Sequence, residues 1–307
     1  MTFIRSKEKE KRTKALLVFV LCVIFCIITR EALSDSISFG IKLAASSIIP
    51  SLFPFFVISD FLSKNSDCLG TGALSKVFEK IFGLPRVAHT AFILGNICGF
   101  PLGVRFAREL YEKGYLTKKE LERTAAISNN PSLAFCVSAV GGGMLGDIFL
   151  GSLLYLSVVF SSVIIGVITR SKCDNLSDCN VIFGQRFVLS DSIKAAGFSS
   201  ITVSSFIIFF SGVLGIVKSL FKSPTVALIF GIFLEVGGAS ASIISSPLDK
   251  GLILPLLAFS LAFSGLSVFF QALCFLPSEI SRAKLLFFKL LQGILAAIIV
   301  LLLSFFV

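Results

Sequence analysis

The sequence predicts an all-α integral membrane protein with about eight or nine hydrophobic segments, arranged as two related halves with broken or re-entrant helices. Three observations support this fold class. The 307 residues are 55% hydrophobic and only 15% charged, with a mean hydropathy of +0.94, whereas soluble proteins carry about 25% charged residues. The apolar residues gather into segments that approach the roughly 20 residues needed to cross a bilayer. Several segments also contain Pro, Gly and polar residues that interrupt a helix.

The apolar segments fall near residues 15–29, 41–63, 88–104, 124–146, 148–169, 195–217, 224–246, 252–276 and 285–307. Segment 148–169 contains no charge and no proline, so it is expected to cross the membrane as one helix. The last segment also qualifies, and Lys289 near its start is expected to extend its ammonium toward the interface.

We divide the chain into four parts: 1–40, a basic tail with an N-terminal membrane helix; 41–169, a first half; 170–190, a polar loop; and 191–307, a second half. The two halves are expected to be related because a Gly-rich broken segment precedes a polar interruption in each. Transporters often use such internal repeats, with discontinuous helices that build a site near the membrane midplane.

The basic tail places the N-terminus in the cytoplasm, because positive residues flanking membrane helices stay on that side. It contains Arg5, Lys7, Lys9, Lys11, Arg12 and Lys14. The net charge of +10 is carried by this tail and by short loops between apolar segments, so we expect no nucleic-acid partner. The bilayer itself is the expected partner, and the cell membrane is the expected location.

Residues 93–103, "ILGNICGFPLG", form the first broken segment. Gly95, Gly99 and Gly103 repeat every four residues and would line one face of a helix, where small residues allow close helix packing. Packing does not explain Asn96 and Pro101, which indicate a helix break and a polar site. A re-entrant hairpin at 88–104 would also place both flanking basic loops, 64–87 and 105–123, on one side of the membrane.

The second break is "SNNPS", in which Pro131 lacks an amide proton and disfavours helix at the residue before it. Backbone groups freed in hydrocarbon must be satisfied by protein or water. The amides of Asn129 and Asn130 offer donors and acceptors, which suits an uncharged polar solute. The alternative is a loop that crosses the interface between two helices.

Glu235 lies in the middle of an apolar segment, followed by Gly237 and Gly238. An ionisable residue at a helix centre costs on the order of 2.5–3.5 kcal/mol on insertion scales. We interpret Glu235 as a solute ligand, or as a group that couples a proton or a sodium ion, with the two glycines allowing the helix to unwind. The alternative is a structural glutamate that is protonated or hydrogen-bonded to a neighbouring helix.

Ser264, Ser267 and Gln271 fall on one face at helical spacing. They are expected either to line a polar cavity or to hydrogen-bond between helices. The predicted substrate-binding set is therefore Asn96, Asn129, Asn130, Glu235, Ser264, Ser267 and Gln271. The helix-break set is Gly95, Gly99, Pro101, Pro131, Gly237 and Gly238.

We expect no enzymatic activity, no catalytic residues, no metal and no cofactor. The sequence contains no P-loop, HExxH or GxSxG motif, and His89 is its only histidine. Residues 105–123 are expected to form a solvent-exposed or interfacial polar helix, with Thr117 and Glu120 as a capping box.

Several stretches, among them "PSLFPFFVISDFL", "FLEVGGAS" and "FSGLSVFFQALCFL", together with the run from Gly99 to Gly143, resemble the sporulation integral membrane protein family of YlbJ type. That family carries the nucleoside-recognition (Gate) domain. The resemblance implies a membrane transporter or transport-like protein of spore cortex formation that binds a small polar, nucleoside-like solute. The alternative is a scaffold or signalling component of cortex assembly that transports nothing. The sequence leaves open the solute, the direction of transport, the coupling ion and whether the protein forms a homo-oligomer.

Overall fold

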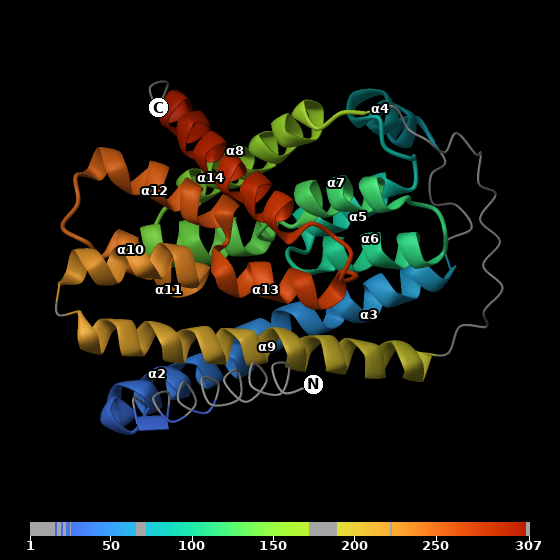
Figure 1. Cartoon of the computed structure of the whole chain (residues 1–307). Helices are drawn as coiled ribbons and strands as arrows, with labels where there is room; N and C mark the ends of the chain where they lie inside the picture. The colour runs from blue at the N-terminus through green and yellow to red at the C-terminus, as the bar shows by residue number, and fades with distance from the viewer. Residues whose placement is uncertain are drawn as a thin grey trace, which may run out of the picture.

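The computed structural model describes residues 26–65, 72–171, 189–221 and 223–304, together with Leu16, Val20, Val23 and Ile24. The predicted basic tail and nearly all of the predicted 170–190 loop lie outside the described residues. The described part contains helices and no strand, which agrees with the predicted all-α class (Figure 1). Its helices are α2 (Arg30–Leu43), α3 (Ile49–Asn65), α4 (Ala73–Phe82), α5 (Ala88–Ile97), α6 (Leu102–Glu112), α7 (Lys118–Ser128), α8 (Ile148–Ile168), α9 (Leu189–Leu220), α10 (Pro224–Leu234), α11 (Val236–Ile244), α12 (Lys250–Phe263), α13 (Gly265–Phe275) and α14 (Arg282–Ser304), with two π-helical stretches, η1 (Ala44–Ile48) and η2 (Phe135–Leu145).

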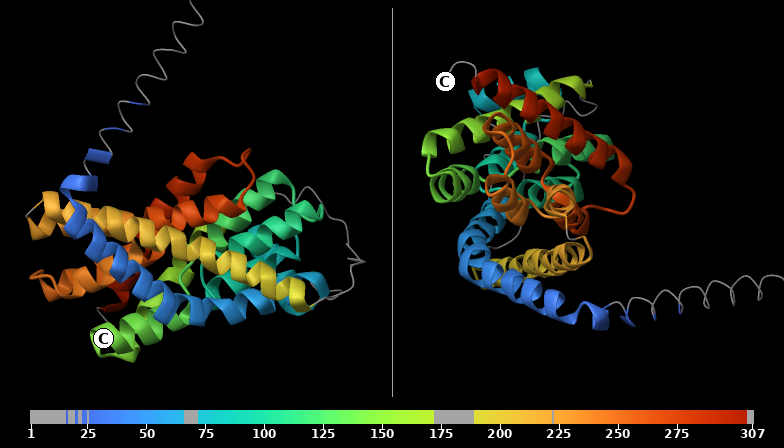
Figure 2. Two further views of the ribbon diagram at one scale, coloured as in Figure 1. Left: turned by 90° about the horizontal axis from the view of Figure 1, so that it is seen from below. Right: turned by 90° about the vertical axis from the view of Figure 1, so that its left-hand side faces the viewer.

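Four helical segments of the described part are long and apolar enough to cross a membrane. They are α8, α9, α14 and the stretch Gly251–Phe275, which joins α12 to α13. Large apolar side chains such as Phe160, Phe209 and Ile298 are exposed on these helices, as expected for surfaces that face lipid. The chain is therefore a multi-pass membrane protein. Helices α2 and α3 both pack along α9 (Figure 2), and α14 packs across α8 (Figure 1).

Helices α5 and α6 form a hairpin of two short arms. They contain 10 and 11 residues, or about 15 Å each at ~1.5 Å per residue, half of a ~30 Å hydrocarbon core. The chain turns at residues 98–101, where Gly99 has φ +89° and the Phe100–Pro101 peptide bond is cis. The predicted helix break within 88–104 is found at residues 98–101, but the hairpin runs from Ala88 to Glu112 and so extends beyond the predicted segment. That the hairpin is re-entrant stays a prediction.

The predicted single face of Gly95, Gly99 and Gly103 is wrong, because the turn separates them. Gly95 lies on α5, Gly103 on α6, and Gly99 in the turn between the two helices. The glycines still serve close packing: a Cβ on Gly103 would lie 2.7 Å from Gly95 Cα. A Cβ on Gly95 would collide with the carbonyl of Ser128, at the end of α7. Both arms of the hairpin thus rest on the second break.

A second hairpin joins α10 to α11, which contain 11 and 9 residues and pack against each other. Glu235 is its turning residue and has extended backbone, φ −150° and ψ 124°. Two further helices are interrupted rather than reversed. Residues 129–132 separate α7 from the helical chain that continues into η2, and Ser264, with φ 69°, separates α12 from α13.

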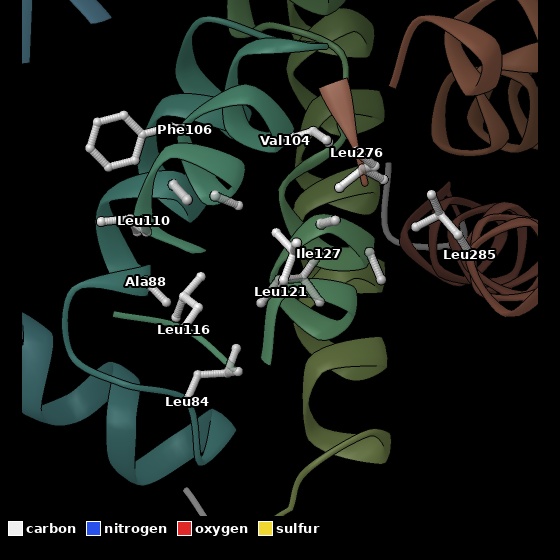
Figure 3. Close-up of a cluster of buried hydrophobic side chains, with 14 of the residues drawn as sticks. Leu84, Ala88, Val104, Phe106, Leu110, Leu116, Leu121, Ile127, Leu276 and Leu285 are labelled. Atoms are coloured by element: carbon white, nitrogen blue, oxygen red, sulfur yellow. The ribbon is translucent and has the colours of Figure 1, made fainter. Parts of the chain in front are cut away.

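The sequence predicted an exposed or interfacial polar helix over 105–123, but the structure differs from this prediction. The capping box of this segment is confirmed, since Thr117 and Glu120 exchange both hydrogen bonds at the start of α7. However, Phe106, Leu110 and Leu121 are buried in an apolar cluster that spans α4 to α8 and reaches α13 and α14 (Figure 3). The charges interleave with apolar residues at helical spacing, so one face of each helix is buried while the other is polar.

A buried ion pair links α6 to α3. Arg105 Nη2 lies 3.1 Å from Asp60 Oδ1, and Arg105 Nη1 donates to Ser199 Oγ of α9 at 2.9 Å. The guanidinium also lies over the ring of Phe56, 5.8 Å from its centroid. Arg105 therefore connects the first hairpin to the α3–α9 layer.

We expect Gly95→Ala to lower the free energy of unfolding by about 1–3 kcal/mol, because the added methyl group overlaps the Ser128 carbonyl. Gly197→Ala on α9 is the matched control, since nothing lies within 4 Å of its added Cβ. Thermal denaturation of the purified protein in detergent, followed by size-exclusion chromatography, measures both. Equal stability of the two variants would contradict the close packing described here.

We expect Arg105→Met to cost about 3–5 kcal/mol of stability, because it leaves the buried Asp60 carboxylate without this partner. Arg108→Met should change stability by less than about 1 kcal/mol, because its ion pair with Glu112 is exposed. The same denaturation assay compares them. If the two variants lose equal stability, the buried pair does not hold the hairpin in place.

Candidate functional site

The first hairpin and the Asn-Asn-Pro break meet through a pair of buried amides. Asn96 is on the last turn of α5, where its Nδ2 donates to Phe92 O at 2.8 Å. Its Oδ1 accepts a hydrogen bond from Asn130 Nδ2 at 3.0 Å. Asn130 Nδ2 also donates to Ile127 O at 2.9 Å, which satisfies a carbonyl left free at the end of α7. The structure thus brings together two predicted site residues that are 34 positions apart.

Two residues of α14 complete this arrangement. Gln292 Nε2 donates to Asn130 Oδ1 at 2.7 Å and to Val158 O of α8 at 3.3 Å. Lys289 Nζ donates to Asn129 O at 2.7 Å, to Gln292 Oε1 at 2.8 Å and to Asn130 Oδ1 at 3.4 Å. We call Asn96, Asn129, Asn130, Lys289 and Gln292 the first polar cluster.

The predicted extension of Lys289 toward the interface is wrong. Its side chain is buried, with 1% of the residue exposed, and points at the Asn129–Asn130 break. Sequence reasoning missed both Lys289 and Gln292 as partners of the site. The available signal was their spacing: residues three apart lie on one face of a helix, so a lysine and a glutamine at that spacing in an apolar segment indicate a polar stripe.

Asn129 takes part in the first polar cluster through its backbone carbonyl, and its side-chain oxygen takes no part in the cluster. Its Oδ1 is buried and lacks a hydrogen-bond partner among the described residues. Buried polar atoms are almost always hydrogen-bonded, to protein or to ordered water. This oxygen is therefore a candidate contact for a solute or a water molecule.

Glu235 caps the helix that follows it. Its Oε1 accepts from Gly237 N at 2.7 Å and its Oε2 accepts from Gly238 N at 2.5 Å. An acidic residue is favoured at this position because the start of a helix carries a partial positive charge. The predicted unwinding at Gly237 and Gly238 is wrong: the helix is interrupted at Glu235, and both glycines lie in the first turn of α11, where their amides donate to the Glu235 carboxylate. Each carboxylate oxygen retains a further lone pair for another donor.

The sequence predicted that Ser264 shares a helix face with Ser267 and Gln271, and for Ser264 this prediction is wrong. Ser264 is the linking residue between α12 and α13, with φ 69°, and its Oγ donates to Leu261 O at 2.7 Å. Ser267 and Gln271 do lie together on α13, where Gln271 Nε2 donates to Ser267 Oγ at 3.3 Å. Gln271 Oε1 is buried without a hydrogen-bond partner among the described residues.

The breaks of the second half contact each other directly. A Cβ on Gly265 would lie 3.0 Å from the Leu234 carbonyl oxygen and 3.1 Å from Glu235 N, so the Ser264 interruption sits against the tip of the second hairpin. Phe100, in the turn of the first hairpin, packs on the apolar cluster that contains Val236 and Val268. Both hairpin tips therefore border the same apolar cluster. Among the described residues, no group of three His, Cys, Asp or Glu side chains could hold a metal ion.

Comparison with known proteins gives one informative relative. The chain is 27% identical to the sporulation integral membrane protein YlbJ of Bacillus subtilis (strain 168), over an alignment that covers 86% of this chain and 76% of that protein. No family model matches the chain. No solved structure matches it either. The similarity supports the resemblance to a YlbJ-type membrane protein and leaves the Gate domain as a prediction.

We expect Asn130→Ala to destabilise the protein by several kcal/mol, at about 1–3 kcal/mol for each buried partner left unsatisfied. The change removes partners from Asn96, Gln292 and Lys289. Asn129→Ala is the matched control, because the Asn129 side-chain oxygen lacks a partner and the backbone carbonyl that binds Lys289 remains. Thermal denaturation of both variants in detergent is the measurement. A larger loss for Asn129→Ala than for Asn130→Ala would contradict the described network.

Proposed function

We propose that this protein is a membrane transporter, or a transport-like protein, that binds a small polar solute at its helix breaks and acts in spore cortex formation. The observation that carries the proposal is the set of helix interruptions with buried polar groups. Discontinuous helices in transporters build solute sites in this way, and irregular backbone at membrane depth is tolerated only inside protein or beside a water-filled cavity. The sporulation role rests on the similarity to YlbJ.

The order of elements supports two related halves within 41–169 and 191–307. The first contains the hairpin α5–α6, the interrupted pair α7 and η2, and the long helix α8. The second contains the hairpin α10–α11, the interrupted pair α12 and α13, and the long helix α14. We infer an internal duplication in which each half contributes one hairpin tip and one interrupted helix.

The unused hydrogen-bonding groups indicate the chemistry of the solute. Asn129 Oδ1 and Gln271 Oε1 are buried acceptors without partners among the described residues, and the Glu235 carboxylate also retains acceptor capacity. The amide donors of Asn96 and Asn130 are already engaged. A solute with several hydroxyl or N–H donors matches these groups, and a nucleoside is one such molecule. Glu235 is the candidate for coupling to a proton or a sodium ion.

The alternative function is a scaffold or signalling component of cortex assembly that transports nothing. One observation favours it: both Glu235 oxygens already accept backbone hydrogen bonds from their own helix. A glutamate in this position stabilises the hairpin tip without any solute. The two functions differ in whether a solute binds saturably and whether the charge at Glu235 is needed.

We expect a solute screen by thermal shift to find a nucleoside or another polyhydroxylated compound that raises the Tm of the purified protein. A ligand at 100 times its Kd contributes about 2.7 kcal/mol. Asn129→Ala and Gln271→Ala should each lose most of this shift. Ser205→Ala is the control, because Ser205 is exposed on α9 and its hydroxyl donates to Ile201 O of the same helix. If no compound gives a saturable shift, the solute site is wrong.

We expect Glu235→Gln to abolish function in a spore-forming host that lacks its own copy, measured as the yield of heat-resistant spores. Glutamine has one acceptor oxygen in place of two, and it carries no charge. The Tm of the purified variant shows whether the protein still folds. A stable Glu235→Gln protein that restores normal spore yield would favour the scaffold.

A further inference from the structure

The buried ammonium of Lys289 is coordinated in a way that the proposed solute site does not use. Its three N–H groups meet three oxygens, Asn129 O at 2.7 Å, Gln292 Oε1 at 2.8 Å and Asn130 Oδ1 at 3.4 Å. All three oxygens belong to neutral amides. None of the ion pairs formed among the described residues includes Lys289. In the described part of the chain, amide dipoles therefore balance the positive charge.

This oxygen set has the composition of a monovalent cation site. Transporter helices that unwind near the midplane coordinate sodium ions through backbone carbonyls at the break, and carbonyl oxygens are ligands that hard cations prefer. Here the break after α7 provides one backbone carbonyl and one side-chain carbonyl, and α14 provides a third oxygen. A lysine ammonium is a compact point charge with three donors, so it can satisfy the same oxygens.

We propose that Lys289 is a built-in cation: its ammonium takes the place that a free monovalent ion would otherwise occupy at the Asn129–Asn130 break. The break is then assembled without Na⁺ or K⁺. The final helix, far away in the sequence, supplies the charge that the first half of the chain requires. This inference does not rest on the identity of the solute or on transport.

The surroundings explain why a cation is needed. Asn130 Oδ1 already accepts from Gln292 Nε2, while the carbonyl of Asn129 and the side-chain oxygen of Gln292 are directed at Lys289 Nζ. The end of α7 adds the negative end of its helix dipole to these oxygens. Without the ammonium, converging oxygens would face one another in a buried site, an arrangement that attracts any available cation.

The test compares wild type with Lys289→Ala in NaCl, KCl and choline chloride at equal ionic strength, with Tm in detergent as the readout. We expect any effect of Na⁺ or K⁺ on the wild-type Tm to be absent from Glu235→Gln, because such an effect would come from the separate Glu235 site and not from the Asn129–Asn130 break. Lys289→Ala should have a Tm lower by several degrees in choline chloride and regain at least half of the loss in Na⁺ or K⁺, saturably with cation concentration. Lys289→Met is the matched control: its side chain fills the space without charge, so Na⁺ and K⁺ should not rescue it.

Two results would overturn the proposal. The first is a Lys289→Ala protein whose Tm, or whose yield of folded protein, is the same in choline as in Na⁺ and K⁺. The second needs no Lys289 variant: a saturable stabilisation of the wild type by Na⁺ or K⁺ that Gln292→Ala removes and Glu235→Gln retains would show that a free ion, in addition to Lys289, binds at this break.

Discussion

The constraint on which the structure depends is that every backbone group freed at a helix break must find a partner inside the protein. A bilayer interior offers no water to satisfy them, and this chain has helix interruptions among its apolar segments. Asn130 returns to the Ile127 carbonyl at one break, and Lys289 takes the Asn129 carbonyl. At another, Glu235 accepts the first free amides of α11. The first role of these polar side chains is therefore to hydrogen-bond the backbone groups that the helix breaks leave free.

The same constraint distinguishes polar groups that are hydrogen-bonded within the protein from polar groups that are available to bind a solute. Asn96 and Asn130 have their amide groups engaged within the protein, so replacing them affects the architecture before it affects any solute. Asn129 and Gln271 each keep a buried oxygen without a partner among the described residues. Such oxygens are costly to bury, and they are the strongest indication that the breaks serve a purpose beyond their own stability.

Close backbone approach is the second condition for this arrangement. The first hairpin rests on Ser128 through Gly95 and Gly103, positions at which an added methyl group has no room. This contact brings Asn96 within reach of Asn130. The buried Arg105–Asp60 pair then fixes the hairpin to α3, and the Arg105–Ser199 hydrogen bond fixes it to α9. Small residues and one ion pair therefore position the amides that the sequence had identified by type.

The sequence alone determined the membrane class, the helical fold and the segments in which the helices break, because hydropathy, prolines, glycines and a mid-segment glutamate act locally. It also located the capping box of α7, whose two partners are three residues apart. It could not determine that Gly95, Gly99 and Gly103 lie on the two arms and the turn of a hairpin, because the same spacing of glycines occurs in straight helices and in hairpins. Nor could it show that Lys289 turns inward: a lysine near a helix end reaches water unless a distant segment offers it oxygens. Only the tertiary structure, by packing α14 near the break 160 positions away, decided that this charge is buried, because the free energy of a buried ion depends on its partners in space.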